Sequence, residues 1–408
     1  MRAKPVWIML FVLTVVFLFL YVFFTLQPAK VTSTALEYFS REEILLGRKY
    51  WRERQLLFAL SFVIRVLVLT AVALGPWAAV FARRVLQAAR GHRLLAVLLY
   101  LVALWSLLQL ISLPLSFYRG YVLEHRWGLS TQSLAGWWTD YVKSATLDLG
   151  LSAVGAMLFF TALQRWPGGW WVPAGVLMAG WIVIQTLLWP ILVAPLFNRF
   201  EPVQDPEVIG MIRQLADRAG IPVEEVLVMD ASRRTNKANA YFAGIGKTKR
   251  IVLYDTLLDN YSSAEVEAVV AHEMAHWKLG HIRTGILLGI LATFVQFYLL
   301  ALVLKSSVCG RESGQYPLQA WAIALLVMML TAFVTSPVET AVSRQMERAA
   351  DRQSVKLTQN PNGAVALQLN LARQNRSDVL PPWFIEWFAY THPSTLRRIE
   401  LLKRSLVK

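Results

Sequence analysis

The strongest constraint on the fold is a series of apolar segments that recur along the chain. Seven segments are each long enough for an α-helix to cross the hydrocarbon core of a bilayer, which takes roughly 20 residues. They are Pro5–Leu26, Leu56–Phe81, Leu94–Phe117, Ala145–Leu163, Val172–Leu196, Ile282–Leu304 and Leu318–Ser336. Because lipid offers no hydrogen-bond partners, main-chain groups in such segments must be paired within a helix. We therefore predict an α-helical integral membrane protein with seven transmembrane helices.

The composition supports this prediction and excludes several other classes of protein. Hydrophobic residues make up 56% of the 408 residues and charged residues only 16%, as is typical of membrane proteins. The net charge of +15 comes mainly from basic residues at the ends of apolar segments. We therefore expect the lipid bilayer, and no nucleic acid, as a partner. The single cysteine, Cys309, excludes an internal disulfide and a cysteine-rich zinc site.

Two features of the apolar segments leave alternatives. The first segment follows the basic start "MRAK", as a signal peptide does, but its apolar run is too long and no small-residue cleavage site follows. We interpret it as an uncleaved span. Four polar residues lie inside later segments, and they either face a watery cavity or pair with neighbouring helices. They are Arg65, Gln109, Gln185 and Gln296.

The apolar segments divide the chain into four parts. Residues 1–197 hold five transmembrane helices, 198–281 are water-soluble in character, 282–336 hold two more helices, and 337–408 are again soluble in character. In the first soluble part, "PEVIGMIRQLADRAG" predicts a helix that ends at Gly220. The stretches "EEVLVMD" and "KRIVLYD" predict strands of a small β-sheet.

A glycine-rich stretch between these strands, "GIGKT", has the look of a phosphate-binding loop. Such a loop needs a glycine five positions before Gly246, where this chain has Tyr241. We therefore interpret Gly244 and Gly246 as a hairpin turn.

The motif "HEMAH" predicts a metal site on a helix. Ser262 and Glu265 form a capping box that opens this helix. His272 and His276 are one turn apart on one face, so both imidazoles can bind the same Zn²⁺ ion. Glu273 is rotated away from the metal, where it can take a proton from water as general base.

A third ligand is expected in "SRQMERAAD", where Glu347 and Asp351 share a helical face. Glu347 can bind the metal, while Asp351 can accept a hydrogen bond from a ligand histidine. The alternative for this pair is an exposed, charged helix face. His281 is rejected as a ligand because it lies five residues after His276, on another face. Two apolar segments lie between His276 and Glu347, and an even number returns the chain to the same side of the membrane.

Several stretches, together with the seven segments, resemble one known family. They are "LWPILVAPLFNRFEPV", "NAYFAG", "HEMAHWKLGH", "SRQMERAAD" and "HPSTLRRI". The chain resembles the M48 metalloproteases, and within them the CAAX prenyl protease type 1 (Ste24) branch. The resemblance implies a gluzincin-type protease domain, zinc on His272, His276 and Glu347, and helices that enclose a water-filled chamber.

The resemblance also implies how substrate is held. The stretch "NAYF" would be an edge strand that pairs with extended peptide through Asn239, Ala240 and Tyr241. His392 would donate to the oxyanion of the tetrahedral intermediate. Arg398 would brace the site or bind the substrate end. The alternatives are a simple turn at His392 and a surface ion pair at Arg398.

The resemblance implies an integral membrane zinc endopeptidase that cleaves peptide or prenylated CAAX proteins. Its membrane would be a bacterial inner membrane or the endoplasmic reticulum, with the active site facing the cytoplasm. Basic residues occur on both sides of the predicted spans, so charge asymmetry does not fix the orientation. The alternatives are a quality-control protease without prenyl specificity, or a transporter or scaffold with a structural metal site. The latter pair needs no general base such as Glu273.

Overall fold

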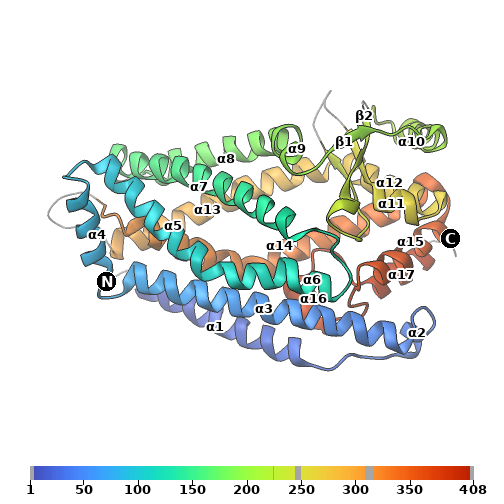
Figure 1. The fold of residues 1–408 in the computed structure, drawn as a ribbon, viewed down its shortest axis with the longest axis horizontal. Helices are drawn as coiled ribbons and strands as arrows, with labels where there is room; N and C mark the ends of the chain where they lie inside the picture. Colours follow the sequence, from blue (N-terminus) through green and yellow to red (C-terminus); the bar gives the residue numbers. More distant parts are fainter. Residues whose placement is uncertain (1–3, 224, 244–249, 308–315, 405–408) are drawn as a thin grey trace.

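The computed structural model describes residues 4–223, 225–243, 250–307 and 316–404. It is an elongated helical bundle, with the described N-terminal residues near one end and the C-terminus at the other (Figure 1). Seven helices in the described ranges are long and apolar enough to cross a membrane. The predicted number of transmembrane helices is therefore confirmed.

Six of the seven spanning helices are longer than the apolar segments that predicted them, and α8 is longer only when its continuation to Phe197 is included. The seven helices are α1 (Lys4–Leu26), α3 (Arg41–Leu74), α5 (Arg93–Phe117), α7 (Leu134–Arg165), α8 (Trp171–Leu188), α13 (His281–Ser307) and α14 (Ala320–Thr358). Two of them continue through a π-helical turn into a short helix. α5 passes through Tyr118–Val122 to α6 (Leu123–Arg126), and α8 passes through Trp189–Val193 to α9 (Ala194–Phe197). Such π-helical turns often mark functional positions in helices.

One predicted boundary was wrong. The second apolar segment was expected to run to Phe81, but α3 ends at Leu74 and Phe81 lies in a separate helix, α4 (Ala78–Ala88). Gly75 leaves the helix in an extended conformation, and Pro76 follows it. A proline disfavours helical backbone in the residue before it. The break therefore has a local cause that hydrophobicity alone does not reveal.

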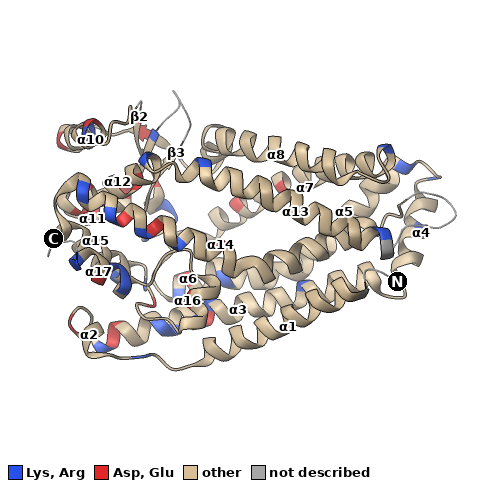
Figure 2. Ribbon diagram, turned by 180° about the vertical axis from the view of Figure 1, so that it is seen from behind, with Lys and Arg blue, Asp and Glu red and all other residues tan. Residues whose placement is uncertain are grey.

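The water-soluble elements gather at one end of the bundle. A four-stranded sheet has the order β1-β2-β4-β3, formed by β1 (Phe200–Pro202), β2 (Glu225–Met229), β3 (Ala240–Ala243) and β4 (Arg250–Tyr254). The helices of this end are α10 (Pro206–Ala219), α11 (Asp255–Asn260), α12 (Ser263–Lys278), α15 (Pro361–Gln374), α16 (Trp383–Ala389) and α17 (Thr395–Arg404), and α2 (Ser33–Leu36) lies beside them. The charged residues concentrate here, whereas the spanning helices are mostly uncharged (Figure 2).

The sheet agrees with the sequence prediction where it is described. β2 and β4 pair in parallel, and β3 pairs with β4 in antiparallel orientation at the edge of the sheet. α10 ends at Ala219 and is followed by Gly220, whose φ of 68° is left-handed and suits glycine. The predicted turn at Gly244 and Gly246 lies outside the described residues.

Two hydrophobic cores share one helix. The first core lies among the spanning helices, where Phe62 of α3 stacks on Phe333 of α14 with ring centroids 4.2 Å apart. The second core lies between the sheet, α12, α15 and α17, and it includes Val355 and Leu357 of α14. α14 therefore passes from the membrane core into the soluble core as one continuous helix.

A buried ion pair joins the N-terminal helices to the C-terminal part of the chain. Arg48 of α3 lies 3.0 Å from Asp378, and both side chains are almost fully buried. The guanidinium also donates to the main-chain oxygens of Phe24, Thr25 and Gln27 at the end of α1. Removing one partner of such a buried pair typically costs about 3–5 kcal/mol.

Candidate metal centre

α12 holds the two histidines of the motif in the predicted register. Its capping box is present, with the Ser262 main-chain N–H donating to the Glu265 carboxylate at 2.8 Å. The helix packs along the sheet, where Phe242 of β3 contacts Trp277 with ring centroids 5.4 Å apart. The cap and this packing fix where His272 and His276 point.

Three side chains from two helices converge on one point. The ligand atoms of His272, His276 and Glu347 all lie within 4.8 Å of one another. Glu347 Oε2 is 3.2 Å from His272 Nε2, and Glu347 Oε1 is 3.3 Å from His276 Nε2. The two histidine Nε2 atoms are 3.2 Å apart. Two imidazole nitrogens and one carboxylate are the donor set of a catalytic zinc site with an open fourth position.

Behind this cluster, Asp351 lies between His272 and Arg398. Its Oδ1 atom is 3.0 Å from His272 Nδ1. The Arg398 guanidinium holds the same carboxylate with two bonds, Nη2 to Oδ1 at 2.6 Å and Nε to Oδ2 at 2.9 Å. Glu347 and Asp351 are 6% and 2% exposed. This burial excludes the alternative of a solvated, charged helix face for the pair.

Burial and the neighbouring carboxylates shift the pKa values of two residues on α12, His272 and Glu273. Burial opposes a charge on His272, but Asp351 and Glu347 outweigh it and raise the pKa of this histidine to about 10. Carboxylates that favour a proton on an imidazole also favour a divalent cation beside it. Burial raises the pKa of Glu273 above its usual range. A raised pKa is typical of a carboxylate that takes up a proton at neutral pH.

His392 reaches the cluster from the loop between α16 and α17. Its Nε2 atom lies 3.3 Å from Glu347 Oε2, and its side chain is 53% exposed. The ring therefore contacts the ligand cluster while about half of the side chain remains exposed.

Two residues that the sequence interpretation missed hold this loop in place. Arg344 of α14 donates to the main-chain oxygens of Glu386 and Tyr390, each at 2.7 Å. The Glu386 carboxylate accepts the Ser394 N–H at 3.1 Å. Arg344 precedes Glu347 by about one helical turn, so both side chains lie on the same face of α14. This spacing could have indicated from the sequence that Arg344 supports the metal centre.

His281 differs from its prediction. The helix of the motif was expected to continue to His281, which would then lie on another face. Instead α12 ends at Lys278, Gly280 adopts a left-handed φ of 69°, and His281 begins α13. The chain turns back at Gly280, so His281 Nδ1 comes within 3.0 Å of His276 Nδ1. It contacts the far nitrogen of His276, while the ligand cluster of the described residues remains His272, His276 and Glu347.

β3 is the edge strand of the sheet among the described residues, and it lies beside α12. The Tyr254 N–H donates to the Asn239 oxygen at 3.1 Å, and pairs alternate between bonded and non-bonded along an antiparallel ladder. The N–H and C=O groups of Tyr241 therefore point toward β4, whereas those of Ala240 point away from the sheet. An outward-facing pair at an open edge is what an added strand requires.

Two family models cover nearly the whole chain. Residues 202–406 match the model of peptidase family M48, and residues 25–199 match the model described as CAAX prenyl protease N-terminal, five membrane helices. The first match includes all of the ligand cluster.

Individual proteins agree with these matches. A metalloprotease of Bacillus subtilis described as uncharacterized, YhfN, is 29% identical over 94% of this chain and 92% of its own. CAAX prenyl protease 1 of Saccharomyces cerevisiae is 32% identical over 75% of this chain and 71% of its own. The crystal structure of S. mikatae Ste24p superposes with a TM-score of 0.81 at 25% identity, covering 97% of this chain and 98% of that one. The chain is thus a multi-pass membrane metalloprotease and belongs to peptidase family M48, with the architecture of the Ste24 or CAAX prenyl protease type.

Proposed function

We propose that this protein is a zinc endopeptidase in which His272, His276 and Glu347 hold the metal and Glu273 is the general base. The observation that carries the proposal is the convergence of the three ligand atoms within 4.8 Å. The donor set of two nitrogens and one oxygen fits Zn²⁺, which binds such ligands at about 2.0–2.2 Å. Bound there, zinc supplies a Lewis acid that activates water and polarises a carbonyl.

The chain's own residues supply the remaining steps. Glu273 takes the proton from the attacking water and passes it to the leaving amine. Asp351, held by the two bonds from Arg398, faces Nδ1 of His272 and fixes the orientation of that ring. His392, on the open side of the cluster, donates to the oxygen that becomes negative during attack.

The substrate binds as an extra strand on β3. Ala240 offers an N–H and a C=O to extended peptide, and the Asn239 side chain contacts it from the end of the strand. Arg398 is bound to Asp351. In addition to this contact, its guanidinium binds the end of the substrate. Relatives named CAAX prenyl protease 1 support prenylated CAAX proteins, or other membrane-associated proteins, as substrates.

The proposed location is a bacterial inner membrane or the endoplasmic reticulum, with the charged end of the bundle (Figure 2) in the cytoplasm. Single cysteines introduced at this end of a Cys309→Ser protein test this orientation by their reactivity toward a thiol reagent that does not cross membranes. In sealed vesicles of known orientation, we expect these cysteines to be labelled only when the cytoplasmic face of the membrane points outward.

Replacing the proposed general base separates a protease from a scaffold. Glu273→Gln keeps the three ligands and removes the proton acceptor, so we expect normal zinc content and a loss of peptidase activity of about 10²–10⁴-fold or more. Glu267→Gln, on the same helix, is the matched control. Zinc content and peptide cleavage are measured on both purified proteins. Near wild-type cleavage by Glu273→Gln contradicts the mechanism, and zinc without any cleavage by wild type indicates a structural metal site.

Two proline substitutions test the substrate strand. Ala240→Pro removes an N–H that points away from the sheet, so peptide cleavage should fall while zinc content is retained. Tyr241→Pro removes an N–H that points toward β4, so it should also lower the melting temperature. Asn239→Ala should weaken peptide binding more mildly, because the main chain is intact. Undiminished cleavage by a folded Ala240→Pro protein rules out β3 as the substrate platform.

A further inference from the structure

Helix α16 packs along a spanning helix, although it lies in a part of the chain that is water-soluble in character. Its rings meet those of α1 in antiparallel order: Trp383 contacts Phe24 with ring centroids 5.2 Å apart, and Trp387 contacts Phe17 with centroids 6.0 Å apart. The candidate span of α1, Pro5–Leu26, has 22 residues, or about 33 Å at 1.5 Å per residue, which barely exceeds the ~30 Å hydrocarbon core. Phe17 is near the middle of this span, so it lies inside the bilayer, and Trp387 lies beside it.

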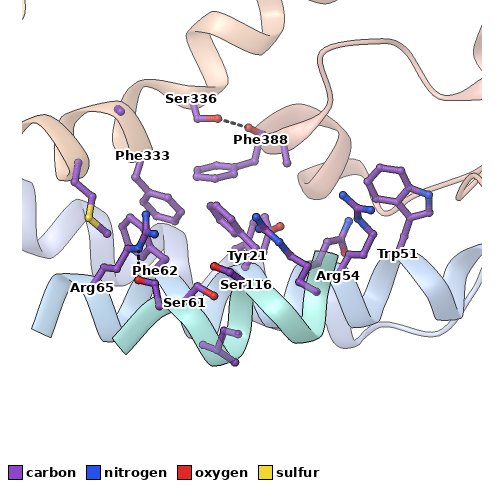
Figure 3. Close-up of a pocket in the computed structure, with 18 of the residues that line it drawn as sticks. Tyr21, Trp51, Arg54, Ser61, Phe62, Arg65, Ser116, Phe333, Ser336 and Phe388 are labelled. Carbon is purple, nitrogen blue, oxygen red and sulfur yellow. Dashed lines mark hydrogen bonds between the residues drawn. The ribbon is translucent and has the colours of Figure 1, made fainter. Parts of the chain in front are cut away.

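The two sides of α16 face different surroundings. On the inner side, Phe388 lies opposite Phe333 of α14, with ring centroids 4.9 Å apart (Figure 3). Phe388 and Ala389 line a cavity of about 670 Å³ inside the bundle, whereas Trp383 and Trp387 are not part of its wall. The two tryptophans therefore lie on the outer side of the helix, away from the cavity.

The outer side of α16 is exposed and apolar. Trp383 and Trp387 are one helical turn apart, so they share a face, and they are 58% and 38% exposed. Apart from Ala389, the other residues of the helix are buried. They include Glu386, its only charged residue, whose carboxylate accepts the Ser394 N–H. A helix whose outer side faces water normally carries polar residues there, so this face favours apolar surroundings.

The C-terminal end of α16 has its main-chain oxygens paired with protein side chains. The last four oxygens of a helix have no partner inside it, and in α16 three of these accept hydrogen bonds of 2.7 Å from α14 side chains that are four residues apart on one face. The donors and acceptors are Ser336 with Phe388 (Figure 3), Thr340 with Trp387, and Arg344 with Glu386. Lipid offers no hydrogen-bond partners, so a helix that ends inside the bilayer needs such side chains.

We propose that α16 is embedded in the bilayer and that the face formed by Trp383 and Trp387 binds lipid acyl chains. Trp383, beside the last turn of α1, lies at the membrane interface, where tryptophan is enriched, and Trp387 lies deeper. The inference does not depend on the proposed peptidase function. It adds a short membrane-embedded helix to the seven spans. Because His392 follows Trp387 by five residues and contacts Glu347, the bilayer packs against the helix that leads to the metal centre.

Spin labels test this surface in a bilayer. Each variant carries one cysteine, labelled with a nitroxide, in a Cys309→Ser protein reconstituted into phosphatidylcholine vesicles. Collisions of the nitroxide are measured with O₂, which concentrates in hydrocarbon, and with an uncharged nickel chelate, which stays in the water on both sides. At Trp387→Cys we expect chelate collisions at least about tenfold less frequent than at Glu207→Cys, because polar groups are strongly excluded from hydrocarbon. Trp383→Cys should give an intermediate frequency.

Two control positions calibrate the measurement. Phe19→Cys lies on the exposed face of α1, where Phe19 is 67% exposed, and Glu207→Cys lies at the exposed start of α10. The proposal is overturned if the Trp387→Cys label meets the chelate as often as the Glu207→Cys label does, because the face then lies in water. It is also overturned if that label meets neither reagent while the Phe19→Cys label meets O₂, because protein then covers the face. Trp383→Cys supplies the same comparison if Trp387→Cys does not fold.

Discussion

α14 and α8 have similar hydrophobicity in sequence but different positions in the molecule. In the most apolar window of α14, 50% of the residues are buried, whereas none is buried in the corresponding window of α8 and its continuation. α14 packs against α1, α3, α12 and α16 and carries Glu347 into the metal centre. α8 packs mainly on α13, and its only buried residue is Gly175. Similar hydropathy therefore predicts a span but does not distinguish a helix that holds the site from one that faces lipid.

The largest expected effect lies within α14 itself. Glu347→Ala removes a proposed ligand, so the protein should lose its zinc and with it all measurable peptidase activity. Glu339→Ala, an exposed carboxylate on the same helix, should keep both. Metal analysis of the two purified proteins decides the matter. Retention of zinc by Glu347→Ala would show that the metal is held elsewhere.

A smaller effect is expected from packing. Leu326 of α14 is fully buried, whereas Leu177 of α8 is 48% exposed. Lipid is about as apolar as leucine, so Leu326→Ala loses mainly packing, and we expect the low end of the usual range, about 2 kcal/mol. Leu177→Ala should change the stability by less than about 0.5 kcal/mol. The melting temperatures of the two variants are compared in the same detergent. Equal shifts would mean that the difference in burial between α14 and α8 does not affect stability.

The smallest effect concerns the glycines of α8. A Cβ atom on Gly175 would lie 2.5 Å from the Phe294 ring of α13, whereas one on Gly180 would meet no atom within 4 Å. Gly175→Ala should therefore lower the melting temperature slightly, since the ring must move. Gly180→Ala should leave it unchanged or raise it, because alanine favours the helix by about 0.5–1 kcal/mol. A reversed order of the two melting temperatures would place α8 differently against α13.

Local sequence signals predicted much of the fold and of the site. Hydrophobic length predicted the seven spans, and the capping box and motif predicted α12 to within a turn. The end of that helix was missed, because Gly280 ends it in a left-handed conformation although helical periodicity continues through the motif. The contact between His281 and His276 follows from that turn and has no signal of its own in the spacing.

Contacts between distant segments were not predictable in the same way. Arg54, Arg65 and Arg119 line one cavity inside the bundle because of how α3 packs against α5 and its continuation. Only Arg65 lies inside a predicted span, and the other two lie just outside the segments Leu56–Phe81 and Leu94–Phe117. The two bonds from Arg398 to Asp351 likewise depend on the packing of α17 on α14. Sequence patterns describe one helix at a time, whereas these contacts form between two helices that are distant in the sequence.

The buried pair of Arg48 and Asp378 has a consequence for how the protein is made. The two residues are separated by 330 positions. At a synthesis rate of ~5–20 residues per second, Asp378 leaves the ribosome about 15–65 s after Arg48. Of the partners that the folded protein gives the Arg48 guanidinium, only the main-chain oxygens at the end of α1 are made before this time. The ion pair therefore forms only near the end of synthesis, long after α1 and α3 have been made.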